Sequence, residues 1–382
     1  MHEIEKALDD RQLAVTAENL GISRRGFLQF CTGVAATLGL SNTAGIQIAQ
    51  AVSNSGMRRP SVIWLSGSEC TGCTESLLRS THPTLETLIL DMVSLDYSEA
   101  LSVAAGYQVE EAKSAAMKEN WGKYILVVEG AIPTKDGGIY CKIAGKTMLE
   151  HLHEGAEGAA AIVAMGSCSS WGGIPSAGMN PTGAKGVSDI IYDKPIINIP
   201  GCPPNPYNFL SVVLQYVTFN TLPALDDQLR PKFAYGRLIH ENCERRPHFD
   251  AGRFANEFGD EGHRLGYCLY KLGCKGPETW ANCPVIEFGD IGGGIWPVGV
   301  GAPCFGCTEK GVGFTKALHE ASEVSTHTSP EFFPNINPEK GSTATAGSAG
   351  LLGAALGAAV GASAMAIRNL GKSEQQNESQ GS

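Results

Sequence analysis

The chain has 382 residues, which is enough for one large or two ordinary domains once its ends are set aside. Hydrophobic residues make up 43% and charged residues 18%, so a packed core is expected and extensive disorder is excluded. The formal net charge of -10 argues against nucleic-acid binding, which needs clustered Lys and Arg side chains at the phosphates.

Residues 1–51 have the features of an export signal. The pair Arg24–Arg25 stands in "ISRRGFLQF" and precedes an uncharged run rich in Gly, Ala and Thr. Within that run, Ala49 and Ala51 fit a small-x-small cleavage site. The arrangement is typical of a twin-arginine signal, and a loosely ordered N-terminal arm with a buried helix is the alternative. The twin-arginine route exports folded proteins, so cysteines can bind metal before they meet an oxidising compartment.

Residues 59–223 alternate apolar, strand-like runs with stretches of helical pattern. The runs are "SVIWLSG", "YILVVEG", "AAIVAMG" and "PIINIPG", and helices are expected over 74–90, 110–120 and 146–154. This alternation predicts an α/β domain, a flavodoxin-like doubly wound parallel sheet. Ligands bind beyond the C-terminal strand ends of such sheets. Four cysteines follow three of these runs, namely Cys70 and Cys73, then Cys168, then Cys202.

Residues 231–338 consist of short Gly- and Pro-rich pieces that hold six of the twelve cysteines. A segment so poor in regular structure is hard to stabilise by apolar burial alone. Bound cofactors that act as small cores would explain it, so this part is expected to be a mostly irregular iron–sulfur domain.

Residues 347–367 are expected to form a C-terminal transmembrane anchor. They lie in an uncharged run, and about 20 apolar residues suffice to span a bilayer. Gly353, Gly357 and Gly361 form a stripe of small residues of the kind that lets membrane helices approach closely. Arg368 and Lys372 would lie on the cytoplasmic side, which leaves the main body outside. A flexible, low-complexity tail is the alternative.

The strand-end cysteines form a first candidate metal group. A Cys-x-x-Cys pair alone fits redox dithiols, zinc sites and iron–sulfur sites. Two further cysteines at neighbouring strand ends favour a four-cysteine site, which holds either zinc or a [4Fe–4S] cluster.

Two more groups lie in the irregular part. The second group has three cysteines, which suits a [3Fe–4S] cluster better than zinc, because structural zinc completes a tetrahedron of ligands. Its members are Cys283, Cys304 and Cys307. The third group combines three cysteines with a histidine and on its own favours zinc. Its members are His240, Cys243, Cys268 and Cys274. Three metal sites in one chain favour electron transfer over structural zinc.

Together, the leader, the three ligand groups and the apolar tail resemble the small, iron–sulfur subunit of membrane-bound periplasmic [NiFe] uptake hydrogenases, hydrogenase-2 type. The resemblance covers essentially the whole chain. It implies a partner large subunit whose Ni–Fe site splits hydrogen, while this chain removes the electrons one at a time. It also implies delivery to the quinone pool through ferredoxin-like or cytochrome b-type membrane subunits, on the periplasmic side of the inner membrane. Pairing into a dimer of heterodimers is implied too.

The same resemblance assigns each group a cluster and leaves this chain without catalytic residues of its own. The proximal [4Fe–4S] cluster would be held by Cys70, Cys73, Cys168 and Cys202. The medial [3Fe–4S] cluster would be held by Cys283, Cys304 and Cys307. The distal [4Fe–4S] cluster would be held by His240, Cys243, Cys268 and Cys274. Pro297 matches the family's proline at the vacant iron corner of the medial cluster.

Several residues carry a finer expectation. Oxygen-tolerant members of the family add two proximal cysteines where this chain has Gly72 and Gly173, which implies an ordinary [4Fe–4S] cluster and oxygen-sensitive behaviour. Glu75 matches a family glutamate that passes protons, or is a helix N-terminal carboxylate. Cys141 belongs to no group and is expected to be a small buried hydrophobe.

The cations Arg245 and Arg246 are expected to be solvated surface charges, with guidance of an electron partner as the alternative. Two other classes of protein also remain open. One is a free-standing ferredoxin-like carrier or a redox module of another complex, such as a quinone-reductase subunit. The other is a structural zinc or disulfide protein.

Overall fold

The computed structural model describes residues 59–80, 93–219, 221–288 and 295–324, together with Leu28, Cys31, Thr32 and Gly45. The twin-arginine pair and the expected anchor at 347–367 lie outside these residues. Within the described ranges, no helix is both long and apolar enough to cross a membrane.

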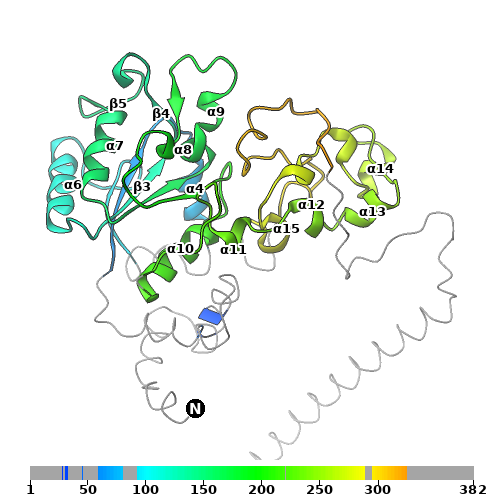
Figure 1. Ribbon diagram of the computed structural model, residues 1–382, viewed down its shortest axis with the longest axis horizontal. Coiled ribbons are helices and arrows are strands. Elements are labelled where there is room, and N and C mark those ends of the chain that lie inside the picture. The colour runs from blue at the N-terminus through cyan, green and yellow to red at the C-terminus, as the bar shows by residue number, and fades with distance from the viewer. Residues whose placement is uncertain are drawn as a thin grey trace, which may run out of the picture. The chain divides into compact units, whose positions relative to one another are not determined.

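The first part of the described chain is built on a five-stranded parallel sheet (Figure 1). Its strands are β1 (Ser61–Ser66), β2 (Ser94–Ser98), β3 (Ile125–Glu129), β7 (Ala161–Met165) and β9 (Ile196–Ile199). They lie in the order β2-β1-β3-β7-β9, which is the flavodoxin-like order 2-1-3-4-5. The predicted α/β class is therefore confirmed. The strand β2 was missed because it is a half-buried edge strand of sequence SLDYS, with no apolar run.

Helices follow the strands of this sheet. They are α4 (Gly72–Leu78), α6 (Tyr107–Glu119), α7 (Met148–Glu157), α8 (Ser167–Trp171), α9 (Gly173–Ser176) and α10 (Pro206–Phe219). The helix expected over 110–120 is confirmed. The one expected over 146–154 begins at Met148, because a capping box between Thr147 and Glu150 sets its N-terminus. Of the helix expected over 74–90, α4 ends at Leu78, and residues 81–90 are outside the described ranges.

Four further strands of two residues each form two antiparallel pairs outside this sheet. The pairs are β4 (Ile132–Pro133) with β8 (Ala184–Lys185) and β5 (Lys142–Ile143) with β6 (Lys146–Thr147).

Alternate residues of β1 enter two apolar clusters, as the period of two in a strand requires. Val62 and Trp64 pack in the cluster that contains the α10 residues, whereas Ile63 and Leu65 pack in the one that contains Met148 of α7. Both faces of the sheet are therefore buried, which explains why its central strands are continuously apolar.

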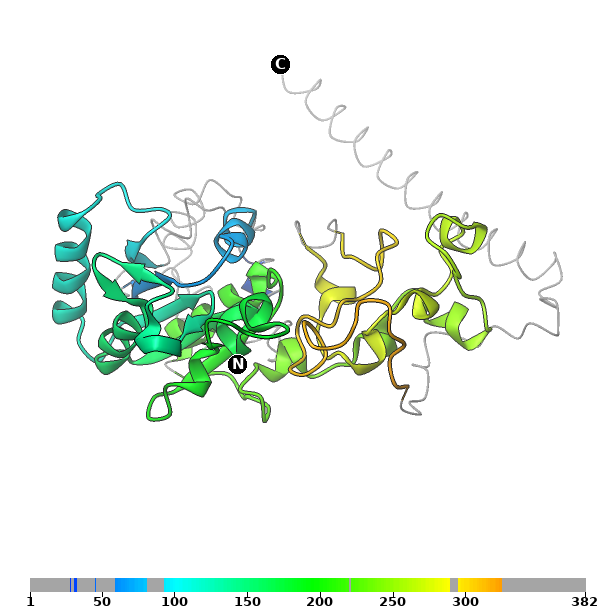
Figure 2. The ribbon, with the colours of Figure 1, turned by 90° about the horizontal axis from the view of Figure 1, so that it is seen from above.

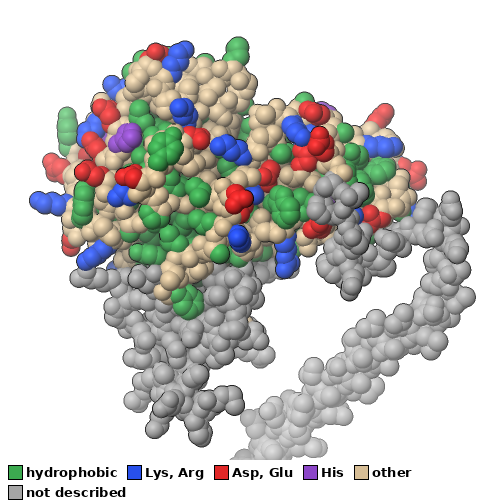
Figure 3. All heavy atoms as spheres, viewed as in Figure 1, with side chains coloured by type: hydrophobic (Ala, Val, Ile, Leu, Met, Phe, Trp, Pro, Cys, Tyr) green, Lys and Arg blue, Asp and Glu red, His purple; other side chains and the backbone are tan. Residues whose placement is uncertain are grey.

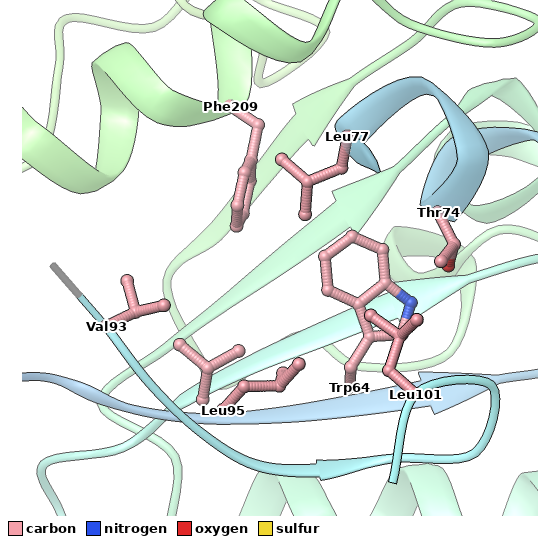
Figure 4. Close-up of a pocket in the computed structure, with 8 residues that line it drawn as sticks. Trp64, Thr74, Leu77, Val93, Leu95, Leu101 and Phe209 are labelled. Carbon is pink, nitrogen blue, oxygen red and sulfur yellow. The ribbon is translucent and has the colours of Figure 1, made fainter. Parts of the chain in front are cut away.

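Trp64 lies on the α10 side of the sheet, in a small apolar pocket that Leu77, Leu95 and Phe209 also line (Figure 4). Its ring meets Phe209 edge-on, with centroids 5.8 Å apart. Its indole nitrogen donates a hydrogen bond of 3.1 Å to the buried Glu129 carboxylate. The core of the sheet is thereby connected to a charged group at the end of β3.

Beyond Pro231 the regular elements give way to short helices and loops (Figure 2). The helices are α11 (Lys232–Tyr235), α12 (Ile239–Asn242), α13 (Arg246–Asp250), α14 (Glu261–Arg264) and α15 (Cys283–Ile286), each of four or five residues. Two 3-10 turns, Tyr270–Leu272 and Gly276–Glu278, complete this part. Within its described residues the only strand pairing is by isolated bridges.

A buried arginine ties this irregular part to the sheet. The Arg230 guanidinium lies 2.8 Å from the carboxylates of both Asp226 and Glu309. Nearby, the Ser167 hydroxyl donates a 2.6 Å hydrogen bond to the Cys307 carbonyl. These contacts hold the loop that carries Cys307 against the C-terminal ends of the strands.

Replacing Arg230 with methionine should lower the free energy of unfolding by about 3–5 kcal/mol, because it leaves the buried Glu309 carboxylate and the half-buried Asp226 carboxylate without their cation. Thermal and denaturant unfolding of the purified protein would measure the change. The control is Lys310→Met, which removes an exposed pair with Asp189 at 3.5 Å and should cost no more than about 1 kcal/mol. Equal losses in the two variants would contradict the buried-pair interpretation.

Candidate metal centres

The first cysteine group assembles at the C-terminal edge of the sheet. Cys73 lies in α4 after β1, Cys168 lies in α8 after β7, and Cys202 follows β9. Burial raises the pKa of the Cys73 thiol, and the Glu129 carboxylate and the Cys168, Cys202 and Cys70 sulfurs raise it further. The four thiols are thus close enough to interact electrostatically, as their positions after the strands predict. Cys70 and Cys202 are exposed, so this group opens to the surface.

Glycines allow the backbone to approach these sulfurs closely. At Gly166, where φ is +93°, an added Cβ would lie 2.5 Å from the Cys73 sulfur. At Gly173, where φ is +48°, it would lie 2.7 Å from the Cys168 sulfur and 2.8 Å from the Cys168 backbone. At Gly72 the nearest atom would be the Cys70 sulfur, at 3.1 Å. Gly72 and Gly173 therefore flank the first group. Of these two positions, only Gly173 is one where an added Cβ would overlap backbone atoms.

Glu129 is a residue of this site that the sequence analysis missed. Its carboxylate accepts hydrogen bonds from the backbone amides of Cys73, at 3.0 Å, and Thr74, at 3.2 Å, as well as from Trp64. These amides lie in the first turn of α4, where a carboxylate is favoured by unsatisfied N–H groups. The available signal was an acidic residue that ends a fully apolar strand, in "YILVVEG".

Glu75 also lies in the first turn of α4 but points outward. Its carboxylate is exposed and pairs with Arg79 at 3.0 Å, one turn along the helix. This geometry fits a helix N-terminal carboxylate, one of the two roles expected for Glu75.

The second group lies next to the first. Cys283 begins α15, and Cys304 and Cys307 lie on one loop. Burial raises the pKa of Cys283 to about 12 and that of Cys307 to about 11, and it raises that of Cys304 well above its usual value. The Cys202 sulfur acts on Cys307 electrostatically, and a hydrogen bond from the Cys202 backbone opposes the rise. One ligand loop of the first group therefore contacts the second group directly.

Pro297 is exposed between the buried residues Trp296 and Val298. Its carbonyl accepts a hydrogen bond of 2.8 Å from the Ala302 amide. Its role at the second group stays a prediction.

The third group surrounds a cavity. His240 of α12, Cys243, Cys268 and Cys274 all line it. Burial raises the pKa of Cys268 to about 12, and it raises the pKa values of Cys243 and Cys274 as well. The His240 ring stands edge-on to Phe249, with centroids 4.5 Å apart. The irregular chain thus brings together all four residues that the sequence predicted for this site.

The second and third groups are also in contact. The backbone amide of Cys304 donates a hydrogen bond of 3.4 Å to the Cys274 sulfur. In the same way, the Arg245 amide donates to the Cys243 sulfur at 3.4 Å. Amide donors of this kind stabilise thiolates and tune metal sites.

The prediction that Arg245 and Arg246 are solvated surface charges is wrong. Both are buried, and both line the cavity of the third group. Arg245 donates to the carbonyls of Tyr267, at 2.9 Å, and Gly299, at 3.3 Å, while Arg246 pairs with Asp250 at 2.9 Å. The apolar stems of both side chains, the distant carbonyl partners of Arg245 and the Asp250 carboxylate one turn from Arg246 make burial possible. Both cations oppose the effect of burial on the pKa of Cys268.

All twelve cysteines belong to the described residues and all are free thiols, so none forms a disulfide. Cys141 is half-buried against the apolar cluster of α7, and burial raises its pKa while a hydrogen bond with Ser68 opposes the rise. In the described part of the chain, no three His, Cys, Asp or Glu side chains are arranged to hold a single metal ion. A single zinc ion needs ligand atoms about 2.0–2.3 Å from one centre.

Two family models match the chain. The model of the 20 kDa subunit of NADH ubiquinone oxidoreductase matches residues 70–216, and that of the C-terminal part of NiFe/NiFeSe hydrogenase small subunits matches residues 235–320. The hydrogenase-2 small chain of Escherichia coli K12 is 55% identical over 357 residues, which are 94% of this chain and 95% of that protein. This chain belongs to the small-subunit family of [NiFe] hydrogenases.

Other relatives agree with this membership. The periplasmic [NiFe] hydrogenase small subunit 1 of Nitratidesulfovibrio vulgaris Hildenborough is 47% identical over 291 residues, 76% of this chain and 90% of that protein. A solved structure of a reduced, active NiFeSe hydrogenase from Desulfomicrobium baculatum has a TM-score of 0.63 and 34% identity. It covers 69% of this chain and 100% of that chain. The resemblance inferred from the sequence is confirmed.

The hydrogenase small subunit is the electron-transferring part of a two-subunit enzyme. Small subunits of this family carry iron–sulfur clusters and pair with a [NiFe] large subunit. The free-standing carrier and the structural zinc or disulfide protein are therefore excluded as functions of this chain.

Replacing Gly173 with alanine should displace Cys168, because the new Cβ overlaps its backbone, and should lower the iron content of the purified enzyme. The matched control is Gly178→Ala, where φ is +65° but no atom lies within 4 Å of an added Cβ. The control should show only backbone strain, of about 1–2 kcal/mol, with full iron content. Normal iron content in Gly173→Ala would contradict the steric argument.

Proposed function

We propose that this hydrogenase small subunit holds two [4Fe–4S] clusters and one [3Fe–4S] cluster and uses them as a three-step electron relay. The first group would bind the proximal cluster, the second group the medial cluster and the third group the distal cluster. When bound, such clusters supply sites that gain and lose one electron at a time. The observation that carries the proposal is the contact between successive groups, through Cys202 and Cys307 and through Cys304 and Cys274.

The donor set fits this chemistry. Ten thiols and one imidazole are the soft ligands that iron–sulfur clusters take. Burial raises the pKa of nine of these thiols, so they are neutral until a metal displaces the proton. Iron binding would thus convert buried thiols into thiolates and stabilise segments that have little regular structure.

Ser167 supports the order of the relay. Its hydroxyl accepts a hydrogen bond of 3.0 Å from the Gly201 amide and donates to the Cys307 carbonyl. Because Gly201 and Ser167 each precede a ligand of the first group, one hydroxyl holds together two proximal loops and the medial loop. This arrangement would keep the distance between the two clusters short and constant.

The first group would face the large subunit. Cys70 and Cys202 are exposed, and Ile174 and Met179, which follow Gly173, are exposed apolar residues. Apolar side chains gather on the face of the molecule seen in Figure 3, between acidic and basic ones. Exposed apolar patches of this kind are typical of subunit interfaces.

The topology of the complex follows from the two ends. Residues 1–51 would be a twin-arginine signal, residues 59–223 and 231–338 the two cluster-binding domains, and residues 347–367 a membrane anchor. The body would lie in the periplasm, the compartment named for the Nitratidesulfovibrio vulgaris relative. The distal site would pass electrons to ferredoxin-like or cytochrome b-type membrane subunits and then to quinone, and paired anchors would form a dimer of heterodimers.

Iron analysis of the complex with its large subunit tests the cluster set. The small subunit should contain about 11 irons, 4 + 3 + 4 for clusters of the usual content. Cys202→Ser should lose the proximal irons, whereas Cys141→Ser should keep them all, because Cys141 belongs to no ligand group. Stoichiometric zinc in place of iron, or equal iron contents in the two variants, would refute the assignment.

Replacing His240 with cysteine tests the exit site. The change puts a charged thiolate in place of a neutral imidazole, which makes the distal site more negative. Electron delivery to the membrane acceptor should slow at least tenfold, while hydrogen activation, measured by H/D exchange on the partner, persists. Unchanged delivery to the acceptor would show that His240 is not the exit ligand.

A further inference from the structure

We propose that Lys275 sets the potential of the distal site, because its buried ammonium group raises the reduction potential of the cluster bound there. The inference rests on the proposed assignment of the distal ligands. It concerns a residue that makes no bond to the cluster and acts through its charge alone.

Lys275 is buried without a carboxylate partner. Only 1% of its surface is exposed, which places it among the most completely buried large side chains. Its ammonium group donates to the Glu320 carbonyl. No carboxylate of the described residues lies within 4.0 Å of it, whereas the buried cation Lys113 has one such partner and the buried Arg230 has two. A buried cation is costly unless something nearby carries negative charge, so an anionic group should bind close to Lys275.

The position of Lys275 identifies that group. It directly follows the distal ligand Cys274, and its backbone amide donates a hydrogen bond of 2.8 Å to the carbonyl of the medial ligand Cys304. The Cys304 amide in turn donates to the Cys274 sulfur. The aliphatic part of Lys275 packs against Gly306. A Cβ added to Gly306 would lie 3.1 Å from the Lys275 Cβ. Lys275 therefore lies where the distal and medial sites meet.

Residues 316–323 hold this arrangement from the other side. Glu320 supplies the carbonyl that accepts from the ammonium group, and the buried Ser322 hydroxyl donates to the Cys274 carbonyl at 2.7 Å. Lys316 pairs with Glu278 at 2.6 Å. The ammonium group is thus anchored by backbone that is itself fixed and cannot move away to solvent.

The charge of Lys275 already acts on the ligand sulfur. Burial is the main influence on the Cys274 thiol and raises its pKa, and backbone hydrogen bonds and the Lys275 cation oppose that rise. Arg245 acts in the same direction, and it donates hydrogen bonds to the carbonyls of Tyr267 and Gly299. Two buried cations, Lys275 and Arg245, therefore act on the Cys274 sulfur.

The sign of the effect follows from electrostatics. Reduction of a cluster held by these residues would add one electron from the medial site, and no bond would be made or broken. A fixed positive charge in a weakly screened interior stabilises the more negative, reduced form. The Lys275 charge would therefore raise the reduction potential of the distal cluster and favour electron transfer to it from the medial site.

The test is an EPR-monitored redox titration of the complete two-subunit enzyme. The distal signal is recognised by its histidine nitrogen hyperfine coupling, and iron content is measured on the same samples. Lys275→Met removes the charge and keeps the length of the side chain, and Lys275→Gln removes the charge but keeps a hydrogen-bond donor. In both, the reduction equilibrium should shift at least tenfold toward the oxidised form, which is 59 mV for one electron.

Two variants serve as controls. Lys271→Met removes an exposed cation from the same loop, whose ammonium group lies 3.1 Å from Asn256, and it should leave the potential unchanged because solvent screens it. Lys275→Arg keeps the charge and should keep the equilibrium within about twofold. Loss of the distal irons in both neutral variants, with retention of these irons in Lys275→Arg, would also support the inference. It would show that the positive charge is needed to balance the negative charge of the bound cluster.

Three results would overturn the inference. The first is an unchanged distal potential in both neutral variants when their iron content is full. The second is a shift of the potential in Lys275→Met that Lys275→Gln does not show. The third is loss of the distal irons in Lys275→Arg as well as in the two neutral variants. Each would leave Lys275 with a packing role only. A wild-type enzyme without a histidine-coupled cluster would instead refute the ligand assignment of the proposed function, so the two failures are distinguishable.

Discussion

Burial of cysteine thiols in chain with little regular structure is the constraint on which the rest of this structure depends. Nine of the ten thiols in the three groups have a pKa raised by burial. Residues 231–288 and 295–324 have little regular structure, so they would depend on the proposed clusters and on a few buried ion pairs such as that of Arg230. The glycines around the sulfurs follow from the same constraint, because the backbone must come close to the bound group.

The sheet provides rigid positions for the first group, and this rigidity extends to the other two groups through hydrogen bonds. Ser167 joins the strand ends to the Cys307 loop, and the Cys304 amide joins that loop to Cys274. Glu129 fixes the first turn of α4 and so the Cys73 sulfur. The proposed relay would need donor and acceptor sites at constant separation, and these few contacts would supply it without long helices or strands in residues 231–288 and 295–324.

Much of the fold and of the candidate site could be predicted from the sequence. The four strands β1, β3, β7 and β9, the helix α6 and most of α7 were evident, since buried strands and amphipathic helices leave periodic patterns. The edge strand β2 was missed, because half of its residues are polar and its stability comes from pairing with β1. The burial of Arg245 and Arg246 was missed too, because a charged residue is normally exposed and the carbonyls that receive Arg245, those of Tyr267 and Gly299, are distant in sequence.

By itself, the sequence predicted which cysteines and which histidine come together in each group, because cysteine spacing and strand ends are local features of the chain. It also determined the family, which the relatives confirm. Only the tertiary structure decided which groups are neighbours, which carboxylate anchors Cys73, and that Lys275 is buried between two sites without a carboxylate. The reason is physical: the field at a buried site depends on charges and dipoles from segments far apart in the chain, and only packing brings these together.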